Sequence, residues 1–427
     1  MQVLYPLYRP EGIEVPGKVP MSTTQGVPSG AKGSLIFGDA TSDYLVVALL
    51  ATGLAEIAER RRRRQAGFAH GRIPRNFEPQ LLPGPWRAAA ARLWWRFQGA
   101  GVAPPADDLA LMQLCRVPFC DWDVHLNLSE IDSEMALLDG DELTELAHEA
   151  ARVGVPDVEA DFIEERTFAM IKAVAELNGT TPEGVQHNYE RLRRFLIDNT
   201  VLSDKQVRTV MREFPSPGTN GQPLVQTLIE IAFERRTSDS PTVQVTCCSD
   251  CGNPLAERAN KCGTPGCVGA PSEKQLSVFE AYFVQHRGVR RYIHDAGLLE
   301  VRLHDTLRAD LPETAVFLRP WPERDAFDLL IAFLDPRDPD PGQPVEVWGV
   351  DGKDHASPTL LAIGFHWKYA VPCHRRFIVL PTHRAEQPGY VPTLTTELEG
   401  RDVGIEVVEE EKFVAMVRAR AAEMELA

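Results

Sequence analysis

The chain has 427 residues, which is enough for two or three domains, and its composition is ordinary for a globular protein. It carries 45 lysines and arginines against 61 aspartates and glutamates, which gives a net charge of −16. This balance excludes a broadly basic nucleic-acid-binding protein and leaves a local basic site or help from a partner. Residues 1–10 lack the apolar core of a secretory signal, and the apolar stretch 44–55 is too short to span a bilayer. We therefore expect a cytoplasmic protein without a membrane segment.

Residues 1–40 are rich in Pro, Gly, Ser and Thr and predict an extended N-terminal arm. Residues 41–240 predict a mostly α-helical region, because apolar positions recur at helical spacing between capping residues. The expected helices cover about 42–64, 85 onward, 141–153, 160–177, 182–198, 203–213 and 224–235. The stripe in the second of these helices predicts core packing, with the members Trp86, Leu93, Trp94 and Phe97. The region contains neither a P-loop nor a Gly-rich dinucleotide motif.

Two groups of basic residues in this region leave alternatives open. The first helix ends in five consecutive arginines at 60–64, which fit either a solvated helix end or a phosphate contact. A later group fits either a solvated helix face, because acidic residues are mixed with it, or a phosphate contact; it consists of Arg191, Arg193, Arg194, Lys205 and Arg208.

The chain has eight cysteines, and five of them lie between positions 247 and 267. Such clustering predicts a metal site in a reducing compartment and not a disulfide scaffold. A C-x2-C pair, Cys248 and Cys251, is followed by a C-x4-C pair, Cys262 and Cys267. Four thiolates at this spacing can surround one structural Zn²⁺, and they leave no open catalytic position. Cys247 stays an alternative to Cys248. Residues 241–271 resemble a zinc ribbon, which could contact nucleic acid, contact a protein or only stabilise the fold.

Two apolar runs at 327–333 and 345–353 flank a Pro/Asp/Gly-rich turn and predict a hairpin of adjacent strands. Side chains alternate along a strand, so Asp351 and Lys353 share a face while Gly352 points away. Asp328 on the first strand and Asp351 on the second offer oxygen ligands to a hard divalent cation. The Lys353 ammonium can stabilise negative charge beside the attacking water or the phosphate.

This arrangement resembles the PD-(D/E)xK, or restriction-endonuclease-like, nucleases, although Phe327 replaces the proline of that motif. A helix expected at 276–285 carries Glu280, where many family members place a glutamate near the metal. The resemblance implies a Mg²⁺- or Mn²⁺-dependent DNA endonuclease with 5′-phosphate and 3′-hydroxyl products. It assigns metal binding to Asp328 and Asp351, with Glu280 and the Gly352 carbonyl as further ligands. Lys353 then orients or activates water.

The rest of residues 272–427 predicts an α/β/α sandwich around a mixed sheet. Further strands are expected near 315–318, 376–381 and 403–408, and helices near 359–370 and 409–424. The first of these helices carries Lys368, a candidate polar residue beside the active site. We therefore expect a multidomain chain that ends in an α/β restriction-endonuclease-like domain.

The order of a helical region, a four-cysteine ribbon and a D…DxK domain is similar to the nucleases associated with prokaryotic PIWI-RE proteins. That resemblance implies defence against phages or plasmids, with a PIWI-RE protein and a DinG-type helicase as partners that recognise or unwind DNA. Two alternatives stay open. One is a catalytically inactive nuclease-fold adaptor that binds nucleic acid or partner proteins. The other is a zinc-ribbon DNA-binding regulatory protein, which the acidic charge disfavours.

Overall fold

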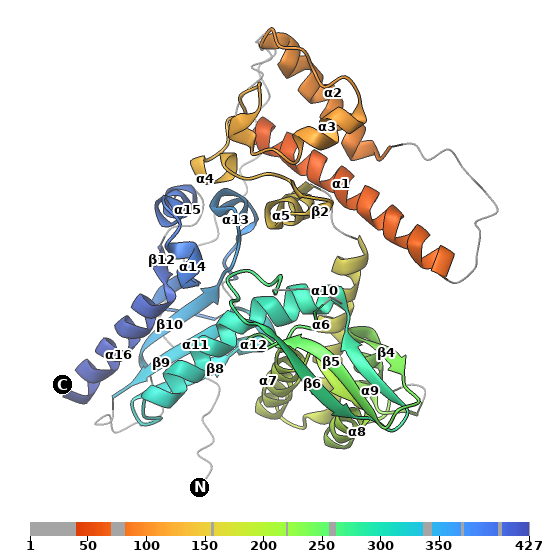
Figure 1. Ribbon diagram of the computed structural model, residues 1–427. Coiled ribbons are helices and arrows are strands. Elements are labelled where there is room, and N and C mark those ends of the chain that lie inside the picture. The colour runs from red at the N-terminus through yellow and green to blue at the C-terminus, as the bar shows by residue number, and fades with distance from the viewer. Residues whose placement is uncertain are drawn as a thin grey trace, which may run out of the picture. The chain divides into compact units, whose positions relative to one another are not determined.

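The computed structural model describes residues 40–69, 82–154, 158–218, 221–255, 262–335, 344–368, 371–399 and 404–426. Residues 1–39 of the predicted arm lie outside the described residues. The chain divides into two compact units, and each is discontinuous in sequence (Figure 1). The first unit takes the chain up to residue 157 together with 355–365 and 388–397, and the second takes the remainder. The predicted domain boundaries at 240 and 271 both fall within the second unit and stay predictions.

The first unit is mostly helical, as the sequence predicts for this region. Its elements are α1 Ala40–Ala69, α2 Gly84–Gly99, α3 Asp108–Leu114, a 3₁₀ turn Phe119–Asp121, α4 Glu130–Ser133, β1 Leu138–Asp139, β2 Glu142–Leu143, α5 Glu145–Gly154, α13 Pro358–Gly364 and most of α15 Tyr390–Glu399. Trp86, Leu93 and Phe97 of the predicted stripe are buried in its core. Trp94 is 45% exposed, so its assignment to the core is wrong.

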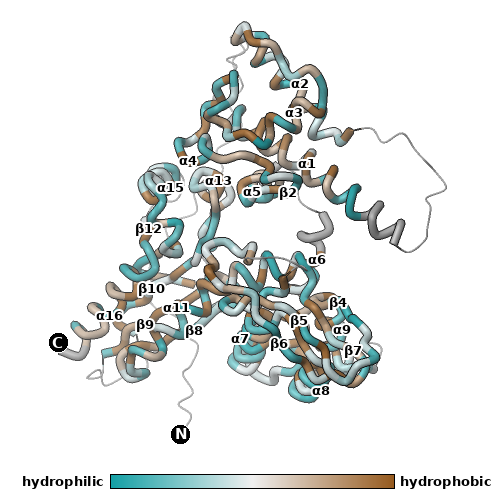
Figure 2. The backbone as a smooth tube through the Cα atoms, viewed as in Figure 1, coloured by the Kyte–Doolittle hydropathy of each residue, from teal (hydrophilic) through white to brown (hydrophobic). Residues whose placement is uncertain are grey.

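Helix α1 becomes hydrophilic toward its C-terminal part (Figure 2), and the arginine run lies there, before the last turn, because the helix continues to Ala69. Arg60, Arg61 and Arg62 each pair with a carboxylate, at 3.3, 3.2 and 2.9 Å respectively. Two of these pairs lie within the helix itself, at i,i+4 and i,i+3. The described part of the run therefore fits a solvated stretch of the helix, and the expected end of the helix at the arginines is wrong because α1 runs to Ala69.

The second unit begins with helices and a small sheet. Its helices here are α6 Val158–Asn178, α7 Pro182–Asp198, α8 Asp204–Glu213 and α9 Leu224–Ala232, and its small sheet has the order β3 Val201–Ser203, β7 Ala281–Gln285, β4 Phe233–Thr237. Thr181 caps α7 by accepting a hydrogen bond from the Gly184 amide, and Pro182 stands at the first turn. Ser203 and Gln206 form a capping box at the start of α8.

The predicted helix at 276–285 is wrong. These residues finish β6 Pro271–Ser277, turn, and form β7, which pairs with β3 and β4. Leu276, Val278 and Val284 are buried in one apolar cluster, and such alternation at even spacing is the period of a strand and not of a helix. Strand β6 in turn pairs antiparallel with β5 Thr242–Cys248.

A five-stranded sheet forms the C-terminal part of the second unit. Its order is β12 Ile405–Glu409, β11 Arg375–Leu380, β10 Pro344–Gly352, β9 Leu329–Leu334, β8 Val316–Pro320. β9 pairs antiparallel with β10, which confirms the predicted hairpin, and β10 pairs parallel with β11, which makes the sheet mixed. Helices α11 Ala296–Asp310 and α16 Glu410–Leu426 lie against the sheet (Figure 1). Their apolar side chains share one buried core with those of the strands.

Short elements complete the second unit. They are α10 Arg287–Val289, a π-helical turn Arg290–Asp295, α12 Pro322–Asp325 and α14 Thr382–Ala385. Helix α13 ends at Gly364, six residues earlier than expected, so Lys368 is not helical; its Nζ donates to the Asp325 carbonyl at 3.1 Å.

Candidate active site and metal centre

Asp328 is fixed against the end of β10 by two hydrogen bonds. Its amide donates to the Val350 carbonyl at 3.0 Å, and its Oδ2 accepts from the Gly352 amide at 2.7 Å. The Lys353 amide donates to the Val379 carbonyl of β11 at 2.9 Å. The backbone of the sheet therefore holds the Asp of one strand beside the Asp-x-Lys of the next.

Asp351 and Lys353 form an ion pair on one face of β10, as the alternation of strand side chains predicts. Their side chains are 15% and 25% exposed, whereas the Asp328 side chain is 10% exposed. Solvent therefore reaches this group of residues from the side of Asp351 and Lys353.

Burial and charge alter the proton affinities of the group. Burial, and then the neighbouring Glu300 and Asp351 carboxylates, raise the pKa of Asp328 well above its usual value. Burial alone would lower the pKa of Lys353, but the carboxylates of Asp351 and Asp328 outweigh it, and the net pKa is raised. Lys353 is therefore an ammonium ion at neutral pH.

Glu300 on α11 lies beside Asp328 and was missed in the sequence. It is 6% exposed, and both its carboxylate oxygens accept hydrogen bonds from Arg193, at 3.1 and 2.9 Å. Burial raises the pKa of Glu300, and Arg193 opposes that rise. One feature of the sequence could have pointed to Glu300. It directly follows Leu299, and Leu299 and Leu303 begin the buried i,i+4 stripe of this helix.

Glu280, by contrast, is not part of this group. Its side chain is 77% exposed, in the turn between β6 and β7, and lies 3.8 Å from Arg235. The structure thus brings together Asp328, Asp351 and Lys353, and places Glu300 where the sequence predicted Glu280.

The group has a deficit of positive charge. When all are ionised, two cations face four carboxylates, namely Arg193 and Lys353 against Glu300, Asp325, Asp328 and Asp351. The remaining charge of about −2 equals the charge that one divalent cation would neutralise, and carboxylate oxygens are the ligands that Mg²⁺ and Mn²⁺ prefer. The charge and the ligand type therefore suit such an ion, although among the described residues only the four cysteines discussed below have their ligand atoms gathered closely enough to hold a metal.

The second candidate centre consists of Cys248, Cys251, Cys262 and Cys267. The four sulfur atoms lie within 4.8 Å of one another, so they could hold a metal ion. The sulfur of Cys248 lies 3.4 Å from that of Cys267, and the sulfur of Cys251 lies 3.5 Å from that of Cys262.

The backbone around the sulfurs is shaped for this cluster. Gly252 has a φ of 77°, and a Cβ on Gly269 would stand 2.3 Å from the Cys248 sulfur. Cys247, the alternative ligand, is instead buried among Val201, Leu276 and Val284. Four thiols without a carboxylate or a histidine fit a structural Zn²⁺.

The four-cysteine cluster contacts residues that lead into the carboxylate group. The Asn253 side-chain amide donates to Asp295, the residue before α11, at 2.6 Å. Gly266 approaches His383 so closely that a Cβ would stand 2.3 Å from its Nδ1. His383 in turn lies 3.2 Å from Asp354, which follows Lys353. An ordered cluster therefore supports both α11 and the segment after β10.

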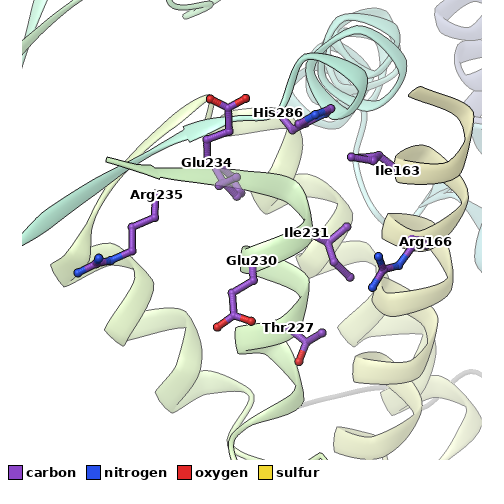
Figure 3. A pocket seen from close by; sticks show the side chains of 9 residues that line it. Ile163, Arg166, Thr227, Glu230, Ile231, Glu234, Arg235 and His286 are labelled. Carbon is purple, nitrogen blue, oxygen red and sulfur yellow. The ribbon is translucent and has the colours of Figure 1, made fainter. Parts of the chain in front are cut away.

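A separate pocket of about 690 Å³ lies between α6, α9 and β4 (Figure 3). Figure 3 shows Arg166 and Arg235 on its lining together with Glu230 and Glu234, so its charge is mixed. None of the candidate catalytic or metal-binding residues lines it. No helix in the described part of the chain is long and apolar enough to cross a membrane.

A family model described as "REase associating with pPIWI_RE" matches residues 297–425. No curated protein and no solved structure matches the chain. The matched segment runs from the second residue of α11 to near the end of α16 and contains Glu300, Asp328, Asp351 and Lys353. The four-cysteine cluster and Glu280 precede it. The resemblance noted in the sequence is thereby confirmed: residues 297–425 form a restriction-endonuclease-like domain linked to pPIWI_RE systems.

Proposed function

We propose that this protein is a Mg²⁺- or Mn²⁺-dependent endonuclease that hydrolyses phosphodiester bonds in DNA. The observation that carries the proposal is the placement of Asp328 against Asp351 and Lys353 by adjacent strands of the mixed sheet. All three residues lie within the segment that matches the nuclease family model.

In this proposal Asp328 and Asp351 hold the cation, and Glu300 takes the role that the sequence assigned to Glu280. A bound Mg²⁺ or Mn²⁺ supplies Lewis-acid stabilisation of the phosphate and lowers the pKa of bound water. The hydrogen bond from Gly352 orients Asp328 through its Oδ2, so its Oδ1 would be the oxygen available to a bound cation.

Lys353 contributes positive charge and does not accept a proton. Because its pKa is raised, the ammonium persists at neutral pH and can stabilise the charge that develops on the phosphate. The partial exposure of Lys353 and Asp351 gives the DNA backbone access from that side. The expected products are a 5′-phosphate and a 3′-hydroxyl.

We further propose that the protein acts with a pPIWI_RE protein in a prokaryotic defence system, with a DinG-type helicase as a second partner. The description of the matching family supports the first partner. The net charge of −16 supports a division of labour in which partners supply much of the grip on DNA. Zn²⁺ on the four cysteines has a structural role in this proposal.

A matched pair of variants tests the assignment of the site. Glu300→Gln should lower Mn²⁺-dependent plasmid cleavage by about 10- to 100-fold, as loss of a group that holds or orients metal ligands does. Glu280→Gln should cleave like the wild type because its side chain is exposed and distant in the fold. The reverse pattern would restore the original assignment of Glu280. A wild-type protein that cuts no DNA, alone or with the pPIWI_RE partner, would favour the adaptor.

A further inference from the structure

The turn that leads into Asp328 has an unusual backbone. Trp321, Glu323, Arg324 and Asp325 have φ values of 47°, 51°, 58° and 93°, and among the described residues no other non-glycine residue has a positive φ. Each such residue costs of order 1 kcal/mol or more, so the surroundings must hold the turn in place. The Trp321 amide donates to the Asp328 carbonyl at 2.8 Å, which ties this turn directly to the candidate ligand.

Helix α7 supplies the residues that hold the turn. The Gln186 side-chain amide donates to the Trp321 carbonyl at 2.9 Å, and its Oε1 accepts from the Arg324 amide at 3.1 Å. Two turns further along α7, Arg193 forms an ion pair with Asp325. The helix therefore contacts the turn at both of its ends.

Arg193 also reaches the carboxylates of the candidate active site. One of its terminal nitrogens bonds both oxygens of Glu300 and lies 3.9 Å from Oδ1 of Asp328. The guanidinium lies 4.9 Å from the ring centre of Trp321 and 5.3 Å from that of Phe168. A planar fork with fixed donors suits this bridging role, which the flexible ammonium of a lysine does not reproduce.

We infer that Arg193 is a positioning residue of the nuclease centre, supplied by a helix outside the segment that matches the family model. Arg193 fixes Glu300 and the strained turn that precedes Asp328. Its positive charge also offsets part of the negative charge of the four carboxylates, which would otherwise exceed the charge that one divalent cation balances. The side chain is only 6% exposed, so it acts through these carboxylates and does not touch DNA. The inference rests on the proposed nuclease function and adds the helical region to the machinery.

The test compares full-length Arg193→Lys with Arg191→Lys, the same substitution on the same helix. Arg191 is a matched control because it is 41% exposed and, among the carboxylates that the structure describes, pairs with Glu213 alone. Mn²⁺ binding is titrated by calorimetry, and cleavage is followed at varied DNA concentration. Arg193→Lys should raise the Mn²⁺ concentration for half-saturation by about tenfold or more and lower kcat, with KM for DNA unchanged. Arg191→Lys should match the wild type.

A second variant separates positioning from general stability. Gln186→Ala removes hydrogen bonds to the turn without changing any charge, and it should weaken Mn²⁺ binding in the same direction. If Arg193→Lys and Gln186→Ala lower Tm but bind Mn²⁺ and cleave as the wild type does, the residues are only structural and the inference is wrong. If Mn²⁺ binding by the wild type does not depend on Asp351, the proposed nuclease function is wrong, whatever the result for Arg193.

Discussion

Asp328→Asn should separate the stability of the fold from the proposed chemistry. Asparagine has nearly the same shape as aspartate, and its Oδ1 can still accept the hydrogen bond from the Gly352 amide. The substitution removes the negative charge and replaces the other carboxylate oxygen with an amide NH2 group. It therefore asks whether that charge serves the fold or serves a bound cation.

The sign of the effect follows from the pKa of Asp328. Burial, Glu300 and Asp351 raise this pKa, and together they outweigh Lys353 and Arg193, which lower it. A carboxyl whose folded pKa exceeds its unfolded value of about 3.9 costs stability as the pH rises through the interval between the two values. The metal-free wild type carries this cost at neutral pH. We expect Asp328→Asn to gain about 1 kcal/mol, or about 2–4 °C in Tm.

The assay is thermal unfolding at neutral pH, in EDTA and then in excess Mn²⁺, alongside plasmid cleavage. In EDTA the variant should unfold above the wild type. In Mn²⁺ the wild type should gain Tm, whereas Asp328→Asn should gain none and cut no DNA. Asp354→Asn is the control, because His383 and Arg384 outweigh burial and lower the pKa of Asp354, so its loss should destabilise the fold in EDTA. An Asp328→Asn protein less stable than the wild type in EDTA would refute this reasoning.

Three further predictions concern the two centres. Lys353→Met should lower kcat by about 100-fold or more, because Lys353 stabilises the charge that develops on the phosphate. The Mn²⁺-dependent gain in Tm should persist, because Lys353 does not bind the ion. An unchanged kcat would show that Lys353 has no part in the mechanism. Cys251→Ser should release zinc to a colorimetric chelator and lower Tm, whereas Cys247→Ser should retain zinc; equal zinc loss from both would contradict the ligand set. The Mn²⁺-dependent gain in Tm should grow as the pH rises from about 4, the usual pKa of a carboxyl, to neutrality, because the ion displaces protons from carboxyls whose pKa is raised. A gain that shrinks over this range would contradict those raised pKa values.

Local chemistry accounts for most of what the sequence predicted correctly. Thr181 and Pro182 define the start of α7, which runs to Asp198 as expected, because capping acts within one turn of the helix. The hairpin of β9 and β10 follows from two apolar runs and the turn between them, and it brings Asp328 to Asp351 without information from the rest of the chain. Cysteine spacing similarly predicts the four-sulfur cluster.

Tertiary pairing decides the features that the sequence missed. The expected helix at 224–235 ends at Ala232, because Phe233–Thr237 pairs with β7 as β4. The same pairing turns the segment around Glu280 into two strands and the turn between them. Glu300 is therefore the helical glutamate that lies beside Asp328.

Arg193 lies on the buried stripe of α7, four residues from both Tyr189 and Ile197, but the sequence does not give its partners, which lie far away in the chain. Arg191 and Arg194 pair with acids on the surface, whereas Arg193 bridges Glu300 and Asp325, more than one hundred residues later. Helical spacing therefore marks Arg193 as the interior residue of this basic cluster, and only its partners required the structure.

The most direct test of the account is cleavage of plasmid and single-stranded DNA in Mg²⁺ or Mn²⁺, with wild type beside Asp351→Ala, each alone and with the pPIWI_RE partner. The Asp351 side chain is 15% exposed, more than those of Asp328 and Glu300, so its removal leaves the buried network of Asp328, Glu300 and Arg193 in place. We predict metal-dependent cutting by the wild type that the variant lacks. Equal cutting by both proteins, or none by the wild type under any of these conditions, would contradict the assignment of this centre as a nuclease.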